Sequence, residues 1–188
     1  MKNKRNIQKI IIGCCKQRPR YQREFVALYS DFLYAICCRY MSDKSSAKDQ
    51  LQISLMKILQ NIETYNQEKG KIESWITRVT INTCLTDLRK RKLNVVSMDD
   101  VSFANTSVNP SIIDDMRTED ILALIQSLPD IYREIFNLVE IDGYKHGEIA
   151  SMLNIKEASS RARLTRAKEM LRIKLTGSNK KKSWINLA

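Results

Sequence analysis

Apolar residues recur at helical spacing along most of the chain, and no segment alternates apolar and polar residues as a strand does. Steps of three and four residues predict two long helices in the first third of the sequence. The first has its apolar positions at Phe25, Leu28, Tyr29, Phe32, Ile36 and Tyr40. The second, over residues 47–62, has them at Ala47, Leu51, Leu55, Ile58 and Ile62. The pattern therefore predicts an all-α protein.

The last third of the chain has a pattern of short helices. Pro129 suits the first turn of a helix that runs to about Ile141. A short helix is predicted over residues 146–153, followed by a tight turn at Asn154, because asparagine tolerates the left-handed backbone that such turns require. A longer helix follows. A short helix, a tight turn and a longer helix make up a helix-turn-helix.

The longer helix of this motif has two distinct faces. At 100° per residue, its buried stripe is Ser160, Leu164, Ala167, Leu171 and Leu175. The opposite side carries Ser159, Ala162 and Arg166, flanked by Arg161, Arg163 and Thr165. In helix-turn-helix proteins the second helix lies in the DNA major groove, where small residues allow close approach and arginines bind guanine edges or phosphates. This face is therefore predicted to bind duplex DNA, and a merely solvated basic helix is the alternative.

Charge supports a nucleic-acid partner and divides the chain. The net charge of +11 and a pI near 9.5 favour a polyanion, with nucleic acid ahead of a membrane surface. The first 23 residues hold eight Lys or Arg and no acid. We predict two small helical domains joined by a flexible acidic linker, and a basic tail that frays; the bounds are 5–92, 93–117 for the linker, 118–175 and 176–188 for the tail.

Several classes of protein are disfavoured. The five cysteines include two adjacent pairs and the chain has one histidine, so a zinc site is poorly supported and reduced, mostly buried thiols are expected. His146 is expected only as a residue near a helix start. No Gly-rich phosphate loop or carboxylate pair indicates catalysis, so no catalytic residue, metal or cofactor is predicted. No apolar run is long enough for a membrane span or a signal peptide, which predicts a cytoplasmic protein.

Two faces in the first domain have polar or apolar residues that its core does not require. Opposite the core stripe of residues 47–62 lie Asp49, Gln52, Ile53 and Met56. Exposed apolar residues among polar ones favour a protein contact. On the next helix, Trp75, Arg78, Asn82 and Arg89 align in one narrow stripe. An aromatic ring, an amide and cations together suit single-stranded DNA, although a core position is the alternative for Trp75.

The segments in which these residues lie resemble a known family. The stretch "LPDIYREIFNLVEIDGYKHGEIASMLNIKEASSRARLTRAKEML" resembles the C-terminal, −35-reading domain of bacterial sigma factors of the extracytoplasmic-function type. Upstream, "FVALYSDFLYAICCRYMSD", "AKDQLQISLMKIL" and "GKIESWITRVTINTCLTDLRK" resemble the N-terminal domain of that family in the right order. The resemblance implies a non-catalytic subunit that binds core RNA polymerase and directs it to promoter DNA.

The resemblance also implies roles for individual residues. It places the face with Gln52 against the polymerase clamp helices, although Ile53 and Leu55 depart from the acid and the aromatic usual in the family. It places Asn82 against the melted −10 strand, and the loop 64–71, which ends in Lys71, around a flipped −10 base. An anti-sigma factor, often membrane-bound, is a further expected partner, and no small-molecule substrate is expected. A self-sufficient helix-turn-helix regulator that binds operators without polymerase is the alternative function.

Overall fold

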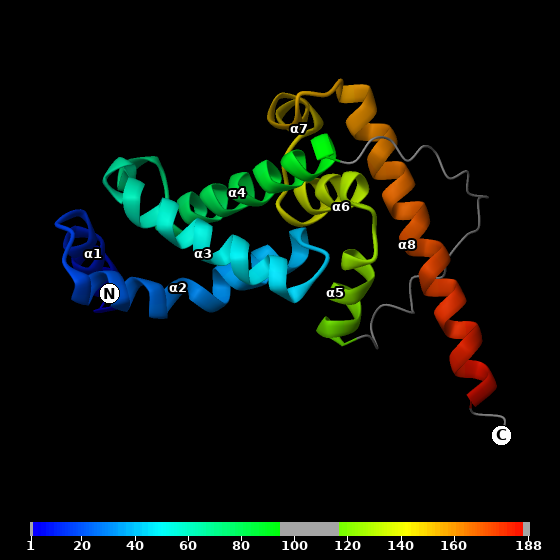
Figure 1. Cartoon of the computed structure of the whole chain (residues 1–188), viewed down its shortest axis with the longest axis horizontal. Helices are drawn as coiled ribbons and strands as arrows, with labels where there is room; N and C mark the ends of the chain where they lie inside the picture. Colours follow the sequence, from blue (N-terminus) through cyan, green and yellow to red (C-terminus); the bar gives the residue numbers. More distant parts are fainter. Residues whose placement is uncertain (1, 95–116, 186–188) are drawn as a thin grey trace. The chain divides into compact units, whose positions relative to one another are not determined.

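The computed structural model describes residues 2–94 and 117–185, with side chains over 6–91 and 117–175. All regular structure in these ranges is helical, which confirms the predicted fold class. The chain forms two compact units, and the division between them falls between Lys90 and Arg91, in the last turns of the first unit's final helix. Figure 1 labels the helices of both units. Nearly all of the predicted acidic linker lies outside the described residues, so its prediction stays a prediction.

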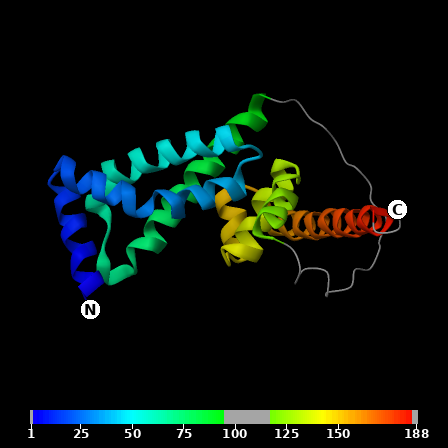
Figure 2. The same ribbon diagram turned by 90° about the horizontal axis from the view of Figure 1, so that it is seen from below.

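The first unit is built on two long helices that run side by side (Figures 1 and 2). Pro19 begins the first of them, where its missing N–H costs no hydrogen bond. Asp43 caps the second by accepting a hydrogen bond from the Ser46 backbone N–H at 2.8 Å. The elements of this unit are α1 (Lys2–Cys15), α2 (Pro19–Tyr40), α3 (Lys44–Asn61), η1 (Ile62–Thr64), η2 (Gln67–Lys69) and α4 (Ile72–Asn94).

The apolar face of α2 is rotated slightly from the predicted one. Phe25, Tyr29, Ile36 and Tyr40 are buried as predicted, and Leu33 joins them. Leu28 and Phe32, predicted for the core, are exposed instead. The apolar positions of α2 span a stripe wider than its neighbours cover, and α1 and α3 leave this shoulder of the helix uncovered.

The core-facing side of α3 includes polar residues that the pattern did not predict. Ala47 and Ile58 are buried as predicted, whereas Leu51 and Leu55 are only half-buried. Gln50 and Ser54 lie fully inside. The core-facing line of α3, which packs against α2, therefore runs from Ala47 through Gln50 and Ser54 to Ile58. The short side chain of Ser54 allows the helices to approach closely.

Threonines do not interrupt α4. Thr80, Thr83 and Thr86 each donate a side-chain hydrogen bond to the carbonyl four residues earlier, at 2.7–2.9 Å. These bonds satisfy the hydroxyls within the helix. Thr80 and Thr83 can therefore be buried beside isoleucines and leucines of the same helix.

The second unit contains the helix-turn-helix. Its elements are α5 (Thr118–Gln126), α6 (Asp130–Phe136), a π-helical turn η4 (Asn137–Ile141), α7 (His146–Leu153) and α8 (Glu157–Ile185). The predicted bounds of the short helix are confirmed by α7, and Asn154 adopts the predicted left-handed conformation, with φ 52° and ψ 52°. Residues 176–185, predicted to fray, continue α8 instead.

A buried arginine ties α5 to α6. The Arg133 side chain is 1% exposed and donates hydrogen bonds to the carbonyl oxygens of Gln126, at 3.0 Å, and Leu128, at 2.7 Å. It also pairs with Asp130. These bonds satisfy one carbonyl in the last turn of α5 and one just beyond it, where the helix offers no partner. The hydrophobic pattern gave no sign of this contact, because arginine is usually exposed.

The cysteine prediction is confirmed. Cys14, Cys37, Cys38 and Cys84 are buried, Cys15 is exposed, and all five are free thiols. Burial raises the pKa of the Cys14 thiol to about 11, which keeps it protonated at neutral pH. Among the described residues, no helix has the length and apolarity that a bilayer crossing requires.

Candidate functional site

The outer face of α3 presents an apolar surface to solvent. Asp49, Gln52, Ile53 and Met56 are all exposed, with Ile53 at 41% and Met56 at 61%. They lie away from the line of Gln50 and Ser54 that faces the core. Substitutions here therefore do not touch the packing of the unit, and the exposed apolar pair is available to a protein partner.

The predicted stripe on α4 is exposed apart from its tryptophan. Arg78, Asn82 and Arg89 face solvent, whereas Trp75 is half-buried. The Trp75 ring lies 6.0 Å from the ring of Tyr65, with the two planes tilted by 51°. This contact holds the half-buried indole at the surface of the unit, where part of the side chain remains accessible.

Two pockets adjoin Trp75. The first, of about 140 Å³, lies under the loop before α4, and its lining includes Lys71 and Arg78. The second, of about 310 Å³, lies between α3 and α4 and includes Asn82. Trp75 and Thr64 line both. The structure thus brings four of the five predicted −10 residues around two adjoining pockets, whereas Arg89 lines neither.

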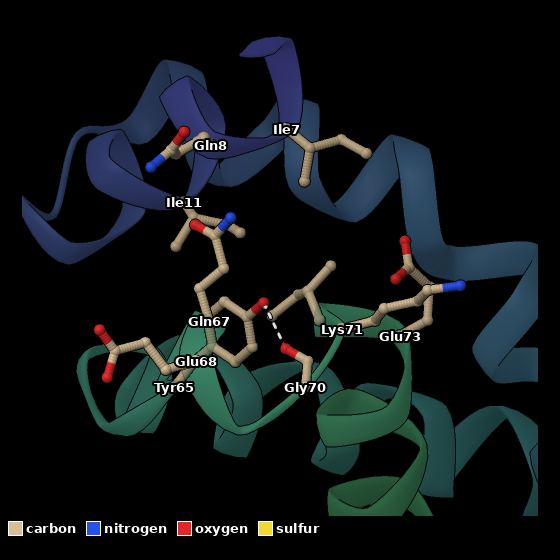
Figure 3. A pocket seen from close by; sticks show the side chains of 10 residues that line it. Ile7, Gln8, Ile11, Tyr65, Gln67, Glu68, Gly70, Lys71 and Glu73 are labelled. Carbon is tan, nitrogen blue, oxygen red and sulfur yellow. Dashed lines mark hydrogen bonds between the residues drawn. The ribbon is translucent and has the colours of Figure 1, made fainter. Parts of the chain in front are cut away.

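The loop between α3 and α4 has a defined conformation. The Tyr65 hydroxyl donates a hydrogen bond to the Gly70 carbonyl oxygen at 3.0 Å (Figure 3). The Asn66 side chain accepts one from the Glu68 backbone N–H at 2.8 Å. Gly70 has a φ of +147°, which favours glycine. Sequence reasoning missed Tyr65, which supports both the loop and Trp75; an aromatic residue five positions before a loop glycine was the available signal.

The two helices of the helix-turn-helix are joined by a side-chain hydrogen bond. His146 Nδ1 lies 2.9 Å from the hydroxyl of Ser160, which is fully buried in the first turns of α8. At the start of α7, the Glu148 carboxylate accepts a hydrogen bond from the Lys145 backbone N–H at 2.8 Å. The position of α8 against α7 therefore rests on a polar contact as well as on apolar packing. His146, expected only near a helix start, has this positioning role in addition.

The predicted outer face of α8 is largely exposed. Arg161, Ala162, Thr165 and Arg166 face solvent, whereas Ser159 is half-buried. Arg161 pairs with Glu157 one turn earlier. Arg166 Nη1 lies 3.5 Å from the Tyr132 hydroxyl, a long contact that leaves its guanidinium at the surface.

Part of the positive charge of α8 is used inside the unit. Arg163 is half-buried, and its Nη1 lies 3.8 Å from the buried carboxylate of Glu134. Lys168 Nζ lies 2.9 Å from a carboxylate oxygen of Glu140. The acids on α6 and η4 thus pair with Arg163, which the sequence pattern assigned to the DNA-binding face, and with Lys168 farther along the same helix. Arg161 and Arg166 are the predicted arginines whose side chains lie on the outer face.

Comparisons with known proteins agree with this arrangement. The family model "Sigma-70 region 2" matches residues 25–93, and the model "Sigma-70, region 4" matches residues 118–171. Region 2 thus covers the α3 face and the α4 pockets, and region 4 covers the helix-turn-helix.

Relatives of known identity match most of the chain. The RNA polymerase sigma factor SigZ of Bacillus subtilis is 31% identical over 137 residues, which cover 73% of this chain and 77% of SigZ. The ECF RNA polymerase sigma factor SigM of the same species is 28% identical over 79% of this chain and 91% of SigM. The alignment with the ECF sigma factor SigE of Mycolicibacterium smegmatis, at 27% identity, covers 79% of this chain but 59% of SigE.

A solved structure shares the fold. It is the sigma factor RpoE in complex with the anti-sigma factor NepR from Bartonella quintana, with a TM-score of 0.52 and 20% identity. The match covers 82% of this chain and 96% of that one. With both sigma-70 regions present in order and relatives along most of its length, the chain belongs to the sigma-70 family of RNA polymerase sigma factors, in its extracytoplasmic-function type.

Proposed function

We propose that the protein is an initiation factor that binds core RNA polymerase and directs it to promoters. The observation that carries the proposal is the presence of two different DNA-compatible surfaces on two units. The pockets around Trp75 suit a melted strand, and the outer face of α8 suits a duplex. No catalytic residue, cofactor, metal or small-molecule substrate belongs to this function, which is exercised in the cytoplasm, where polymerase and promoter DNA are found.

Run-off transcription with core polymerase and a promoter library tests the proposal. The protein should support initiation at a defined subset of promoters, and core polymerase alone should not. A protein that binds a duplex operator tightly by itself but gives no run-off product with core polymerase would be a self-sufficient helix-turn-helix regulator instead.

The melted −10 strand is proposed to bind the two pockets around Trp75. The smaller pocket is framed by cations, Lys71 and Arg78, which suit phosphates on either side of a base held beneath the loop. The larger pocket offers the amide of Asn82, which can donate to and accept from a base edge. Arg89, exposed farther along α4, is proposed to contact the backbone of the same strand.

Asn82→Ala is expected to weaken holoenzyme binding to single-stranded −10 DNA by about 1 kcal/mol or more for each hydrogen bond lost. Fluorescence anisotropy with −10 oligonucleotides measures this. Thr86→Ala is the matched control, because Thr86 lines the same pocket but donates its hydroxyl to the Asn82 carbonyl within the helix. Unchanged open-complex formation by the Asn82 variant on several promoters would remove this residue from the site.

The duplex −35 element is proposed to bind the outer face of α8, through Arg161, Ala162, Thr165 and Arg166 with Ser159 at its edge. Arg163, with its carboxylate partner Glu134, is proposed to hold a phosphate at the border of this face.

Arg166→Ala is expected to cost about 1–3 kcal/mol of −35 binding if the guanidinium makes a bidentate base contact. The loss should depend on sequence. Across −35 duplexes that differ by single base pairs, the variant should lose discrimination at one position and keep it at the others. An equal loss on every duplex would show that Arg166 binds phosphate only.

The outer face of α3, with Asp49, Gln52, Ile53 and Met56, is proposed to bind the polymerase. An anti-sigma factor, either free or anchored in a membrane, is a proposed regulator. Support for it comes from the structural neighbour, whose RpoE was solved with the anti-sigma factor NepR.

A further inference from the structure

A basic groove lies between α1 and the start of α2, in a part of the chain that precedes the matched region 2. Its volume is about 350 Å³, and it is lined by Gln8, Lys9, Ile12, Gly13, Lys16, Arg18 and Tyr21. Three of these seven residues are cations and none is an acid. The side chains of Lys9, Lys16 and Arg18 are exposed, so they can reach a ligand.

The groove has a shape set by the packing of its two helices. Gly13 allows the close contact, because a Cβ there would lie 2.2 Å from the Tyr21 ring. The turn after α1 is closed by hydrogen bonds from Gln17 N–H to the Cys14 carbonyl, at 2.8 Å, and from Arg18 N–H to the Gly13 carbonyl, at 3.1 Å. This is a Schellman motif, with Gln17 in the left-handed conformation. The backbone that carries the three cations is therefore fixed.

The groove adjoins a chain of pockets that leads to the proposed −10 site. Gln8 lines both the basic groove and a neighbouring pocket of about 410 Å³ between α1 and the loop (Figure 3). That second pocket shares Tyr65, Gly70 and Lys71 with the pocket beneath the loop. A strand held at Trp75 thus has a lined path along α1 to the cations.

The chemistry along this path changes from base-compatible to phosphate-compatible. The middle pocket contains Ile7, Ile11 and two carboxylates, those of Glu68 and Glu73, with the single cation Lys71 at the side that it shares with the pocket beneath the loop. The two carboxylates repel phosphates but can accept hydrogen bonds from exocyclic amino groups of bases. The basic groove combines its cations with an aromatic ring and the exposed Ile12, a combination typical of single-strand sites.

We propose that the α1–α2 groove binds the phosphodiester backbone of single-stranded promoter DNA that continues from the −10 element. The proposal rests on the function proposed above, since it extends the melted strand beyond its −10 pockets. Continuity with those pockets favours nucleic acid over an acidic protein as the ligand.

The test uses holoenzyme assembled with the Lys9→Gln, Lys16→Gln double variant. Binding is measured against salt for a −10 oligonucleotide and for two versions extended by about eight nucleotides, one at each end. For wild type, one extension should tighten binding. The double variant should lose that gain, and the slope of log K against log salt should fall by about 1.4 for two lost phosphate contacts. Binding of the short oligonucleotide should not change.

Two control variants separate this site from general charge. Lys44→Gln, Lys48→Gln removes the same charge from the start of α3, beyond the other end of α2, and should bind all three oligonucleotides as wild type does. Lys9→Arg, Lys16→Arg keeps the charge in the groove and should retain the gain from the extension.

Four outcomes would overturn the proposal. The first is that neither extension tightens binding by the wild type. The second is that the two glutamine variants lose affinity equally, which would reflect overall charge. The third is that the groove variant assembles poorly with core polymerase, which would show that the groove binds an acidic protein surface. The fourth is that wild-type holoenzyme has no affinity for the −10 oligonucleotide, and the proposed function would then fail as well.

Discussion

The double variant Gln52→Ala, Met56→Asp is expected to fold as the wild type does and to fail to bind core RNA polymerase. Both residues are exposed on the outer face of α3, and the core contacts of that helix lie on the other side, at Ala47, Gln50 and Ser54. The circular dichroism spectrum and the cooperativity of thermal unfolding should therefore be preserved.

The expected loss of affinity follows from the burial of this face at a protein contact. Covering Ile53 and Met56 would contribute about 1.5–3 kcal/mol each, an upper range for partly exposed side chains. Loss of a desolvated hydrogen bond from Gln52 adds about 1–3 kcal/mol. A carboxylate at position 56 would also have to be desolvated. The variant keeps Ile53, so its loss comes from Met56, Gln52 and the new carboxylate; together these lower the affinity by about a hundredfold or more, since each 1.4 kcal/mol is a factor of ten.

Pull-down of core polymerase by the full-length chain measures this effect. Met56→Leu is the matched control, because it keeps an apolar side chain of similar volume and should bind as wild type does. A double variant that still captures core polymerase at wild-type levels would place the polymerase contact on another surface.

Arg133→Ala is expected to destabilise the second unit by about 2–4 kcal/mol, through a cavity and the loss of hydrogen bonds to two carbonyls. Burial lowers the pKa of Arg133 from its ordinary value, and the nearby Asp130 opposes that shift. Because the ordinary pKa of arginine is so high, the side chain remains a cation at neutral pH. Its stabilising hydrogen bonds are therefore charge-assisted over the whole physiological pH range.

Urea denaturation of the full chain, followed by a probe in the second unit, checks this prediction. Arg172→Ala is the control, because Arg172 forms a partly exposed ion pair with Glu169 on α8 and should cost less than about 1 kcal/mol. The loss of unfolding free energy for Arg133→Lys should lie between those of the two alanine variants, since an ammonium cannot span both carbonyls and Asp130 as a guanidinium does. Equal midpoints for the Arg133 and Arg172 alanine variants would contradict the structural role of Arg133.

Local features of this protein were determined by the sequence alone. The bounds of α7, the left-handed turn at Asn154 and the exposed pair Ile53 and Met56 were all predictable, because each depends on residues within a few positions along the chain. The two sigma-70 regions were predictable for the same reason, since each is marked by contiguous segments that follow one another in the family's order.

Contacts between elements were decided only by the tertiary structure. A helical period defines a broad apolar stripe, but the neighbouring helices decide which edge of it is covered, so Leu28 and Phe32 are exposed while Ser54 is buried. The partner of a charge is likewise set through space. Glu134 holds Arg163 beside α6, and His146 meets Ser160 across the helix-turn-helix, although these residues lie 14 or more positions apart in the sequence.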